Sequence, residues 1–272
     1  MAFKLIALDL DGTLLNSQRT IWPESVRALD QARQKGIQVV IVTGRHHVTT
    51  YPYHHLLALD TPAICCNGTY VYDFRTRSAL ATNPLEKEQV SAILAVARRY
   101  DLQCSVYAEN AVAFEVETER VRRLRDWAES VALPVRPTIH MVKTFEHFLE
   151  TETIIWKIEV SHAEQQVLRT ATEALSATMA LSCDFSWHNM VDIVRLGNSK
   201  GGRLIEWARS QGFEPSEVIA FGDNHNDISM LAQAGMGIAM GNSDETVKAA
   251  ADWVTGDHDS FGIAQALERF VL

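Results

Sequence analysis

The chain has 272 residues, and its 25 Lys and Arg against 34 Asp and Glu give a formal net charge of −9 at pH 7. Because recognition of a phosphate backbone needs a basic surface, this balance disfavours a nucleic-acid-binding protein. With 47% hydrophobic and 22% charged residues, the composition is that of a packed globular chain and lies far from the disordered regime. We therefore expect one large domain or two smaller ones.

Neither an export signal nor a membrane segment is predicted. Lys4, Asp9 and Asp11 interrupt the apolar start of the chain, so a signal-peptide core of ordinary length does not form. The longest apolar runs have the length of strands and fall far short of the about 20 residues that a spanning helix needs. The four cysteines fit neither a disulfide ladder nor a zinc site. We expect a cytoplasmic protein that is a monomer or a weak homodimer.

Short apolar runs alternate with a helical stretch in the first part of the chain. The run Ile6–Leu8 precedes a loop, and helical periodicity then covers Pro23–Lys35. Two further apolar runs follow, Val39–Val42 and Ala63–Cys66. Continuous apolar strands separated by helices predict a parallel sheet that is covered on both faces.

The last part of the chain repeats this order. Helical periodicity over Ser199–Ser210 is followed by the apolar run Val218–Phe221, and a helix over Asp227–Ala234 by the run Gly237–Met240. The two ends of the chain are therefore predicted to be halves of one sheet.

The middle of the chain has a different pattern. Apolar and polar residues alternate over Ala111–Val116, Ile154–Val160 and Leu181–Phe185, which predicts a half-exposed antiparallel sheet. Three helices are expected to pack on its covered face: Lys87–Tyr100, Glu119–Ser130 and Ala163–Ala177.

The predicted fold class is α/β. A Rossmann-like parallel-sheet core is expected from residues 1–83 and 195–272, with an α+β domain inserted as residues 84–194.

Polar stretches follow four of the predicted core strands or lie beside them. The first places Asp9 and Asp11 directly after Ile6–Leu8. Ligands of open parallel sheets bind at the carboxyl ends of the strands, and a one-residue spacer allows both acids to turn toward one pocket. A solvated acidic turn built on Gly12 and Thr13 would have the same residues, so this pair alone leaves both interpretations open.

The second and third stretches suit an anion. Thr43, Gly44 and Arg45 follow Val39–Val42 and offer a hydroxyl, a closely approachable amide and a guanidinium to a phosphate. Lys200 opens a predicted helix and would add a point charge. A strand-to-helix cap and a solvated surface lysine remain the simpler alternatives for each stretch taken singly.

The fourth stretch is acidic. Asp223 and Asp227 lie four residues apart, after Val218–Phe221, with Asn226 between them. Carboxylate oxygens are hard ligands of the kind that Mg²⁺ prefers. The same residues could instead form a helix N-cap cluster.

Four such elements in this order, at the ends of strands, argue against coincidence, and the chain resembles the haloacid dehalogenase (HAD)-like superfamily of phosphohydrolases. The inserted segment resembles the type C2 cap of its Cof-type sugar phosphatase branch. The resemblance is carried by Asp9-x-Asp11-Gly-Thr, Thr43, Lys200 and Gly222-Asp-x-x-Asn226-Asp227, with Asn67-Gly68 also fitting.

The resemblance implies a catalytic scheme. Asp9 would attack the phosphorus and form an aspartyl phosphate, and Asp11 would act as general acid and then general base. Mg²⁺ is the implied cofactor, and its implied ligands are Asp9, Asp11 (through its carbonyl), Asp223 and Asp227. The implied phosphate-binding groups are the amides of Leu10 and Gly44 together with Thr43, Lys200 and Asn226.

The implied substrate is a small phosphorylated metabolite. Overall resemblance puts pyridoxal 5'-phosphate first and sugar phosphates second, and Tyr107, Trp187 and His188 are candidate contacts of the leaving group. A sugar phosphomutase and a non-catalytic phosphate-binding module remain the alternatives.

The histidines invite a separate metal interpretation. His46, His47, His54 and His55 form two pairs, which we expect to be solvated on a helix or loop. His225 occupies an open position of the acidic motif and could face the substrate entrance.

Overall fold

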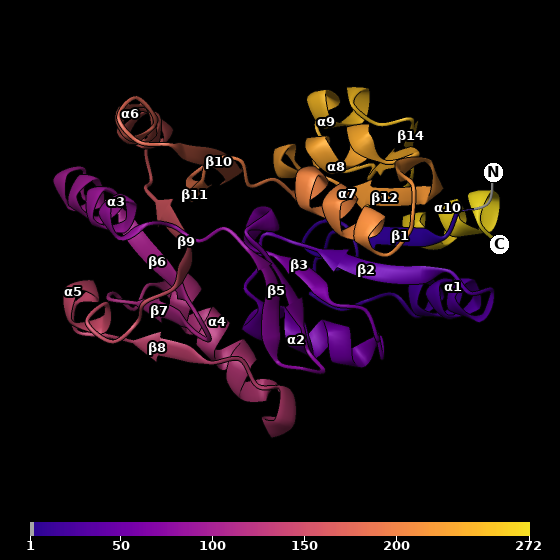
Figure 1. Cartoon of the computed structure of the whole chain (residues 1–272), viewed down its shortest axis with the longest axis horizontal. Helices are drawn as coiled ribbons and strands as arrows, with labels where there is room; N and C mark the ends of the chain where they lie inside the picture. Colours follow the sequence, from indigo (N-terminus) through magenta and orange to yellow (C-terminus); the bar gives the residue numbers. More distant parts are fainter. Residues whose placement is uncertain (1–2) are drawn as a thin grey trace.

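Two sheets organise the computed structural model, which describes residues 3–272 (Figure 1). The larger sheet has eight strands in the order β14-β13-β12-β1-β2-β3-β4-β5, and the smaller has six in the order β10-β11-β9-β6-β7-β8. The first predicted core segment begins at residue 1, so its first two residues lie outside the described range.

The elements of the larger sheet come from both ends of the chain. Its strands are β1 Leu5–Leu8, β2 Gln38–Val42, β3 Ala63–Cys65, β4 Tyr70–Asp73, β5 Ser78–Thr82, β12 Val218–Gly222, β13 Met236–Ala239 and β14 Trp253–Val254. The helices beside it are α1 Pro23–Gln34, α2 His47–Leu56, α7 Lys200–Ser210, α8 Ile228–Gln233, α9 Glu245–Ala249 and α10 Gly262–Phe270. Short 3₁₀ turns are η1 Cys66–Gly68, η3 Pro215–Glu217 and η4 His225–Asp227.

The smaller sheet belongs to the inserted segment, called the cap below. Its strands are β6 Gln103–Ala108, β7 Val112–Phe114, β8 Ile139–Met141, β9 Ile155–Ser161, β10 Leu181–Trp187 and β11 Met190–Arg195. Its helices are α3 Lys87–Arg99, α4 Glu119–Ser130, α5 Phe145–Phe148 and α6 Gln165–Ser176, with the turn η2 Leu133–Val135. None of the helices in the described part of the chain is long and apolar enough to cross a membrane.

β1 is the central strand that joins the two ends of the chain. Leu5 pairs with Val218 of β12 on one side and with Gln38 of β2 on the other, both in parallel register. In Figure 1 the indigo N-terminal strands accordingly lie beside the orange C-terminal ones. The prediction of one sheet from both chain ends is therefore confirmed.

The edge of the larger sheet departs from the predicted pattern. β3, β4 and β5 pair in antiparallel fashion, so a hairpin extends the otherwise parallel sheet. Sequence analysis did not predict this hairpin. β4 follows the turn at Asn67 and Gly68 almost directly, and the half-exposed β5 lacks a continuous apolar run.

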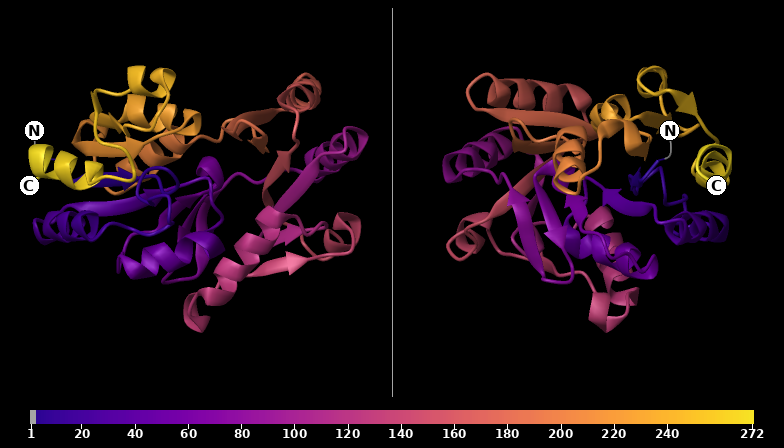
Figure 2. Two further views of the ribbon diagram at one scale, coloured as in Figure 1. Left: turned by 180° about the vertical axis from the view of Figure 1, so that it is seen from behind. Right: turned by 45° about the vertical axis from the view of Figure 1, so that its right-hand side comes forward.

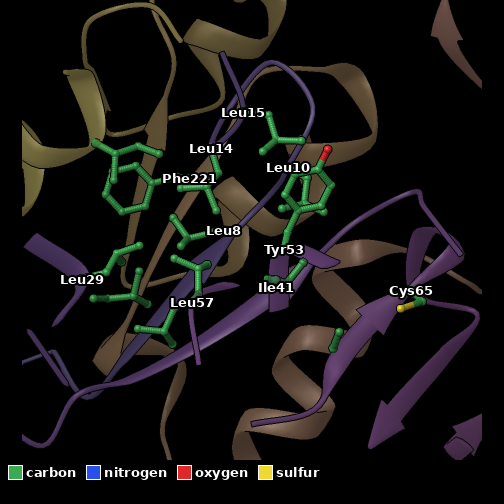
Figure 3. Close-up of a cluster of buried hydrophobic side chains, with 14 of the residues drawn as sticks. Leu8, Leu10, Leu14, Leu15, Leu29, Ile41, Tyr53, Leu57, Cys65 and Phe221 are labelled. Carbon is green, nitrogen blue, oxygen red and sulfur yellow. The ribbon is translucent and has the colours of Figure 1, made fainter. Parts of the chain in front are cut away.

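Alternation along β1 divides the core into two layers. Leu5 and Ala7 pack with residues of α7 and α8, whereas Ile6 and Leu8 pack with residues of α1, α2 and α10. Figure 3 shows part of the second layer, where Leu8 lies near Phe221. Fully burying one such aliphatic side chain contributes about 1.5–3 kcal/mol.

The cap sheet is also two-sided. Apolar residues on one face pack against α3 and α6, as Ile158 and Ile193 do. The prediction that α4 packs on this face too is wrong, because its Val121 packs in the cluster that includes the larger sheet. The other face of the cap sheet is partly apolar as well, and α4 packs there, between the cap sheet and the core. The alternation in the strands did not indicate that this face has a helix as its partner.

The chain enters and leaves the cap at one place. Asn83 and Asn198 flank the two crossings, and each side-chain amide donates to the other residue, at 3.0 and 2.9 Å. The left view in Figure 2 places the cap beside one end of the larger sheet. The boundaries at residues 83/84 and 194/195 stay a prediction.

Candidate active site

A buried lysine joins two carboxylates at the carboxyl ends of the central strands. Lys200 Nζ donates to Asp9 Oδ1 and to Asp227 Oδ1, both at 2.7 Å, and its side chain is 2% exposed. Lys200 is the first residue of α7, whose preceding Ser199 caps the helix by accepting from Gly202 N–H at 3.1 Å. The N-cap at Ser199 therefore positions the backbone of Lys200, and the two carboxylates position its ammonium group.

Asp223 approaches the loop after β1 very closely. Its Oδ1 accepts a hydrogen bond from Thr13 Oγ1 at 2.7 Å. Gly12 has φ +77°, and a Cβ at this position would lie 2.3 Å from Asp223 Oδ2. Only glycine allows this approach. Asn242, which sequence analysis missed, donates to Gly12 O at 2.9 Å and supports the same loop.

Three carboxylates converge here. Asp9, Asp223 and Asp227 each place an oxygen within 4.8 Å of the others. Burial, opposed by Lys200 and reinforced by Asp227, raises the pKa of Asp9 to about 7. Burial, together with Asp9 and Asp227, raises the pKa of Asp223 to about 8. When all three carboxyl groups are ionised, they and the one ammonium carry two net negative charges, which a divalent cation would compensate.

The three carboxylates differ in how many of their oxygens already accept hydrogen bonds. Asp227 accepts from Lys200 through Oδ1 and from the amides of Asp223 and Asn224 through Oδ2, at 3.0 Å each. Asp9 has only its Oδ1 engaged by a side chain. Asp9 and Asp223 therefore fit a hard cation as carboxylate donors, whereas Asp227 also holds Lys200 and the acidic loop. Its role as a ligand stays a prediction.

The Asp11 side chain points to a different partner. Arg45 donates to both of its oxygens, from Nε and from Nη2, at 2.6 Å each. Partial burial works in the opposite direction, but the guanidinium outweighs it and lowers the pKa of the Asp11 carboxyl. Arg45 also lies 5.0 Å from the ring centroid of Tyr53 and 5.8 Å from that of Trp127 in the cap. In this structure Arg45 thus holds the predicted acid–base residue.

The predicted phosphate-binding groups lie in the loops that hold Asp9 and Asp11 or contact them. Among residues 3–272, neither the amide of Leu10 nor that of Gly44 donates a hydrogen bond. Arg45 N–H donates to Thr43 Oγ1 at 3.1 Å, which leaves the hydroxyl hydrogen of Thr43 available to a ligand. Asn226 Nδ2 donates to Asn67 Oδ1 at 3.0 Å.

The histidine pairs are not solvated as predicted. His46, His47 and His54 are buried, and only His55 is exposed. His46 contacts Ala108 O through Nε2 at 2.7 Å, and burial lowers its pKa to about 3. These rings fill space between α2 and its neighbours, as the stacking of His47 on Tyr72 at 3.7 Å shows. The described residues offer one metal-binding set, and no histidine belongs to it.

The candidate leaving-group contacts lie in unlike settings. Tyr107 is buried and donates to Glu159 at 3.1 Å, whereas Trp187 is 62% exposed. Trp187 and His188 are at the tip of the β10–β11 hairpin, which touches the fourth motif through a 2.7 Å bond from Asn224 Nδ2 to Ser186 O. His225 is exposed and pairs with Asp244 at 2.5 Å.

Sequence analysis missed charged residues of the cap that face the core. Lys157, Glu159 and Asp192 are buried on the face of the cap sheet opposite α3 and α6. The alternation over Ile154–Val160 contained the signal, because Lys157 and Glu159 occupy its polar positions. A polar face in such a strand is usually solvated, so their burial could not be read from the pattern.

Known proteins identify the family. The model of the haloacid dehalogenase-like hydrolase family matches residues 6–267. The chain belongs to this family. It is 42% identical over 265 residues to the pyridoxal phosphate phosphatase YbhA of Escherichia coli, covering 97% of each chain. It is 29% identical over 269 residues to the 5-amino-6-(5-phospho-D-ribitylamino)uracil phosphatase YcsE of Bacillus subtilis, covering 99% of this chain and 96% of that one.

The solved structures agree with the fold of this HAD-like hydrolase. A haloacid dehalogenase-like hydrolase from Bacillus subtilis superposes with a TM-score of 0.86 at 27% identity, covering 98% of this chain and 100% of that one. The predicted α/β fold with a parallel-sheet core and an inserted cap is thereby confirmed.

Proposed function

We propose that this HAD-like hydrolase is a Mg²⁺-dependent phosphatase of small phosphate monoesters, with pyridoxal 5'-phosphate as its main substrate. The convergence of Asp9, Lys200 and Asp223 at one sheet edge carries the reaction class. The substrate rests on the identity of 42% to the Escherichia coli pyridoxal phosphate phosphatase over nearly all of both chains. Phosphorylated sugars and polyols are the second group of candidates, in line with the named substrate of the Bacillus subtilis relative.

The proposed chemistry has two steps on Asp9. A carboxylate oxygen of Asp9 attacks the phosphorus in line, the bond to the leaving oxygen breaks, and Asp11 gives that oxygen a proton. In the second step Asp11 takes a proton from water, which attacks the phosphorus and releases phosphate from Asp9. Lys200 holds the Asp9 carboxylate in place through its 2.7 Å bond and offsets part of the charge that gathers there.

A bound cation would offset the negative charge of the carboxylates at the proposed active site. Bound by Asp9 and Asp223, with the Asp11 carbonyl and Asp227 as further predicted contacts, Mg²⁺ would supply positive charge to the transferring phosphoryl group. The protein groups that would hold the phosphate are the Leu10 and Gly44 amides, the Thr43 hydroxyl, Lys200 and Asn226.

The setting of the enzyme belongs to the proposal as well. We place it in the cytoplasm as a monomer or weak homodimer that binds neither nucleic acid nor membranes. The net charge of −9 supports the first of these exclusions.

The test is phosphate release from purified protein with Mg²⁺. Pyridoxal 5'-phosphate, pyridoxamine and pyridoxine phosphates, hexose phosphates and pentitol phosphates are compared by kcat/KM. The highest value is expected for pyridoxal 5'-phosphate. Equal kcat/KM values across the panel would reject pyridoxal 5'-phosphate as the main substrate but leave the phosphatase reaction standing. Formation of an isomerised sugar phosphate without free phosphate would show that the enzyme is a mutase and not a phosphatase.

A further inference from the structure

A lysine of the cap reaches into the phosphate loop of the core. Lys157 Nζ donates to Gly44 O at 2.8 Å and to Asp192 Oδ1 at 2.9 Å. The side chains of Lys157 and Asp192 are each 3% exposed. The ammonium also lies 4.2 Å from the ring centroid of Tyr107. An ion pair of two cap strands is thus anchored on a backbone carbonyl of the core.

The peptide group whose carbonyl accepts from Lys157 also makes a hydrogen bond through its N–H. Gly44 C=O and Arg45 N–H lie in one planar unit, and this N–H donates to Thr43 Oγ1 at 3.1 Å. Fixing the carbonyl therefore fixes the N–H. Because a lone pair of the Thr43 hydroxyl is then occupied, its hydrogen is directed to another acceptor. Lys157 acts in this way on the hydroxyl that is proposed to bind phosphate.

The other oxygen of Asp192 connects the same ion pair to two further loops. Asn67 Nδ2 donates to Asp192 Oδ2 at 2.8 Å, and Asn67 Oδ1 accepts from Asn226 at 3.0 Å. Asn67 has φ +57°, and the preceding Cys66 has φ +49°. Consecutive left-handed residues other than glycine are strained, and surrounding contacts must hold them. The contacts from Asp192 and Asn226 have this effect on Asn67.

Stability does not account for the ion pair. Removing two charges from water is costly, and apolar residues of similar volume would pack at least as well in a buried position. Glu159, two residues along the same strand, shows the contrast. Its partners Ser105, Tyr107 and Arg120 all belong to the cap, so it holds the cap together without touching the core.

We propose that Lys157 is a positioning residue of the phosphate loop, which it orders from the docked cap by holding the Gly44–Arg45 peptide. The inference rests on the proposed binding of phosphate by Thr43 and Gly44. It adds that the affinity for the phosphoryl group depends on a cap residue that does not touch it. Opening of the cap would withdraw Lys157 and weaken the grip on phosphate, which favours product release.

The experiment measures binding of inorganic phosphate by calorimetry to the full-length protein in excess Mg²⁺. Inorganic phosphate has no leaving group, so contacts between a leaving group and the cap do not contribute. The variant is Lys157→Met with Asp192→Asn, which leaves no buried unpaired charge. The matched control is Glu159→Gln. Circular dichroism and thermal unfolding are recorded for each protein.

A rise of the phosphate Kd by tenfold or more in the double variant, with a change below twofold in Glu159→Gln, is the expected result. A folded double variant with a Kd within twofold of the unmodified protein would overturn the inference. If the double variant does not fold, Lys157→Gln with Asp192→Asn replaces it, because the glutamine side chain is one atom shorter than that of Lys157 and keeps a polar group in its place; the same two outcomes apply. Unmodified protein that neither binds phosphate nor hydrolyses any ester refutes the proposed function itself.

Discussion

Arg45 donates two hydrogen bonds of 2.6 Å to the two carboxylate oxygens of Asp11. While this bidentate contact lasts, one lone pair of each oxygen is occupied, and the guanidinium disfavours the protonated form that a general acid needs. Arg45 is held in turn between Tyr53 of the core and Trp127 of the cap. The position of the cap and the side chain of the predicted acid–base residue are therefore linked through one guanidinium.

The role of Asp11 is tested by esters with different leaving groups. Asp11→Asn is expected to lower turnover of pyridoxal 5'-phosphate by about 10²–10⁴-fold, because the leaving oxygen no longer receives a proton. Formation of the phosphorylated enzyme from p-nitrophenyl phosphate should fall much less, since nitrophenolate leaves without one. Rapid-quench measurement of nitrophenolate release separates this step from hydrolysis. Equal losses for both esters in this step would contradict the assignment.

Asp9→Asn should remove turnover and preserve the fold. Its amide oxygen can still accept from Lys200, and the loss of one of three adjacent carboxylates relieves repulsion in the site. We therefore expect no detectable phosphate release and an unfolding temperature at least as high as that of the unmodified protein. Residual activity above about 1% would rule Asp9 out as the nucleophile, since a nucleophile removed from a covalent mechanism costs far more.

Mg²⁺ should stabilise the protein through Asp223. A ligand at a hundred times its Kd adds about 2.7 kcal/mol to the free energy of unfolding. Saturating Mg²⁺ is therefore expected to raise the unfolding temperature, and EDTA to remove activity. In Asp223→Asn the shift should be absent or much reduced. A shift of unchanged size in this variant would place the cation elsewhere.

Acid should destabilise the protein through His46. Its pKa is about 3 in the folded state against 6.5 for an ordinary histidine, because burial disfavours the charged form. Between these values the unfolded chain binds more protons, so stability is lost as pH falls from 6.5 toward 3. His46→Gln can keep the bond to Ala108 O without this protonation. The loss of unfolding free energy between pH 7.5 and 5.5, measured in urea, should be smaller by about 1.4 kcal/mol. An unchanged loss would refute this account.

Two neighbouring glycines of α7 should differ in how much stability is lost when each is replaced by alanine. A Cβ at Gly201 would lie 2.1 Å from Ser229 O, so Gly201→Ala must push α7 away from α8. The cost is expected to be about 1–3 kcal/mol or more. At Gly202 a Cβ would meet only the Ser199 hydroxyl, at 2.9 Å, which can rotate away, so Gly202→Ala should cost no more than the loss of that N-cap bond, about 1 kcal/mol. Denaturant unfolding of both variants compares them; similar losses would argue against close packing of the helices at Gly201.

The chemistry-bearing residues of the core were predictable because they follow apolar strands. The carboxyl ends of parallel strands share one edge, so Asp9, Thr43 and Asp223 could be placed together from spacing alone. The grip of Arg45 on Asp11 could not, since it depends on side-chain directions and on the cap. The same holds for Lys157 and Asp192, whose partners lie more than 100 residues away in the core.

Because β1 lies between β2 and β12, the two domains can complete their sheets only in a certain order while the chain is being synthesised. Leu5 leaves the ribosome early, but its partner Val218 follows only after 212 further residues, counted between positions 5 and 218. Until then one edge of the strand that carries Asp9 has no partner, and unpaired edges invite association between chains. The cap strands, whose partners lie within the cap, can pair in the meantime. A nascent chain would therefore carry a folded cap on an incomplete core sheet, and the surroundings of the proposed nucleophile Asp9 would form last.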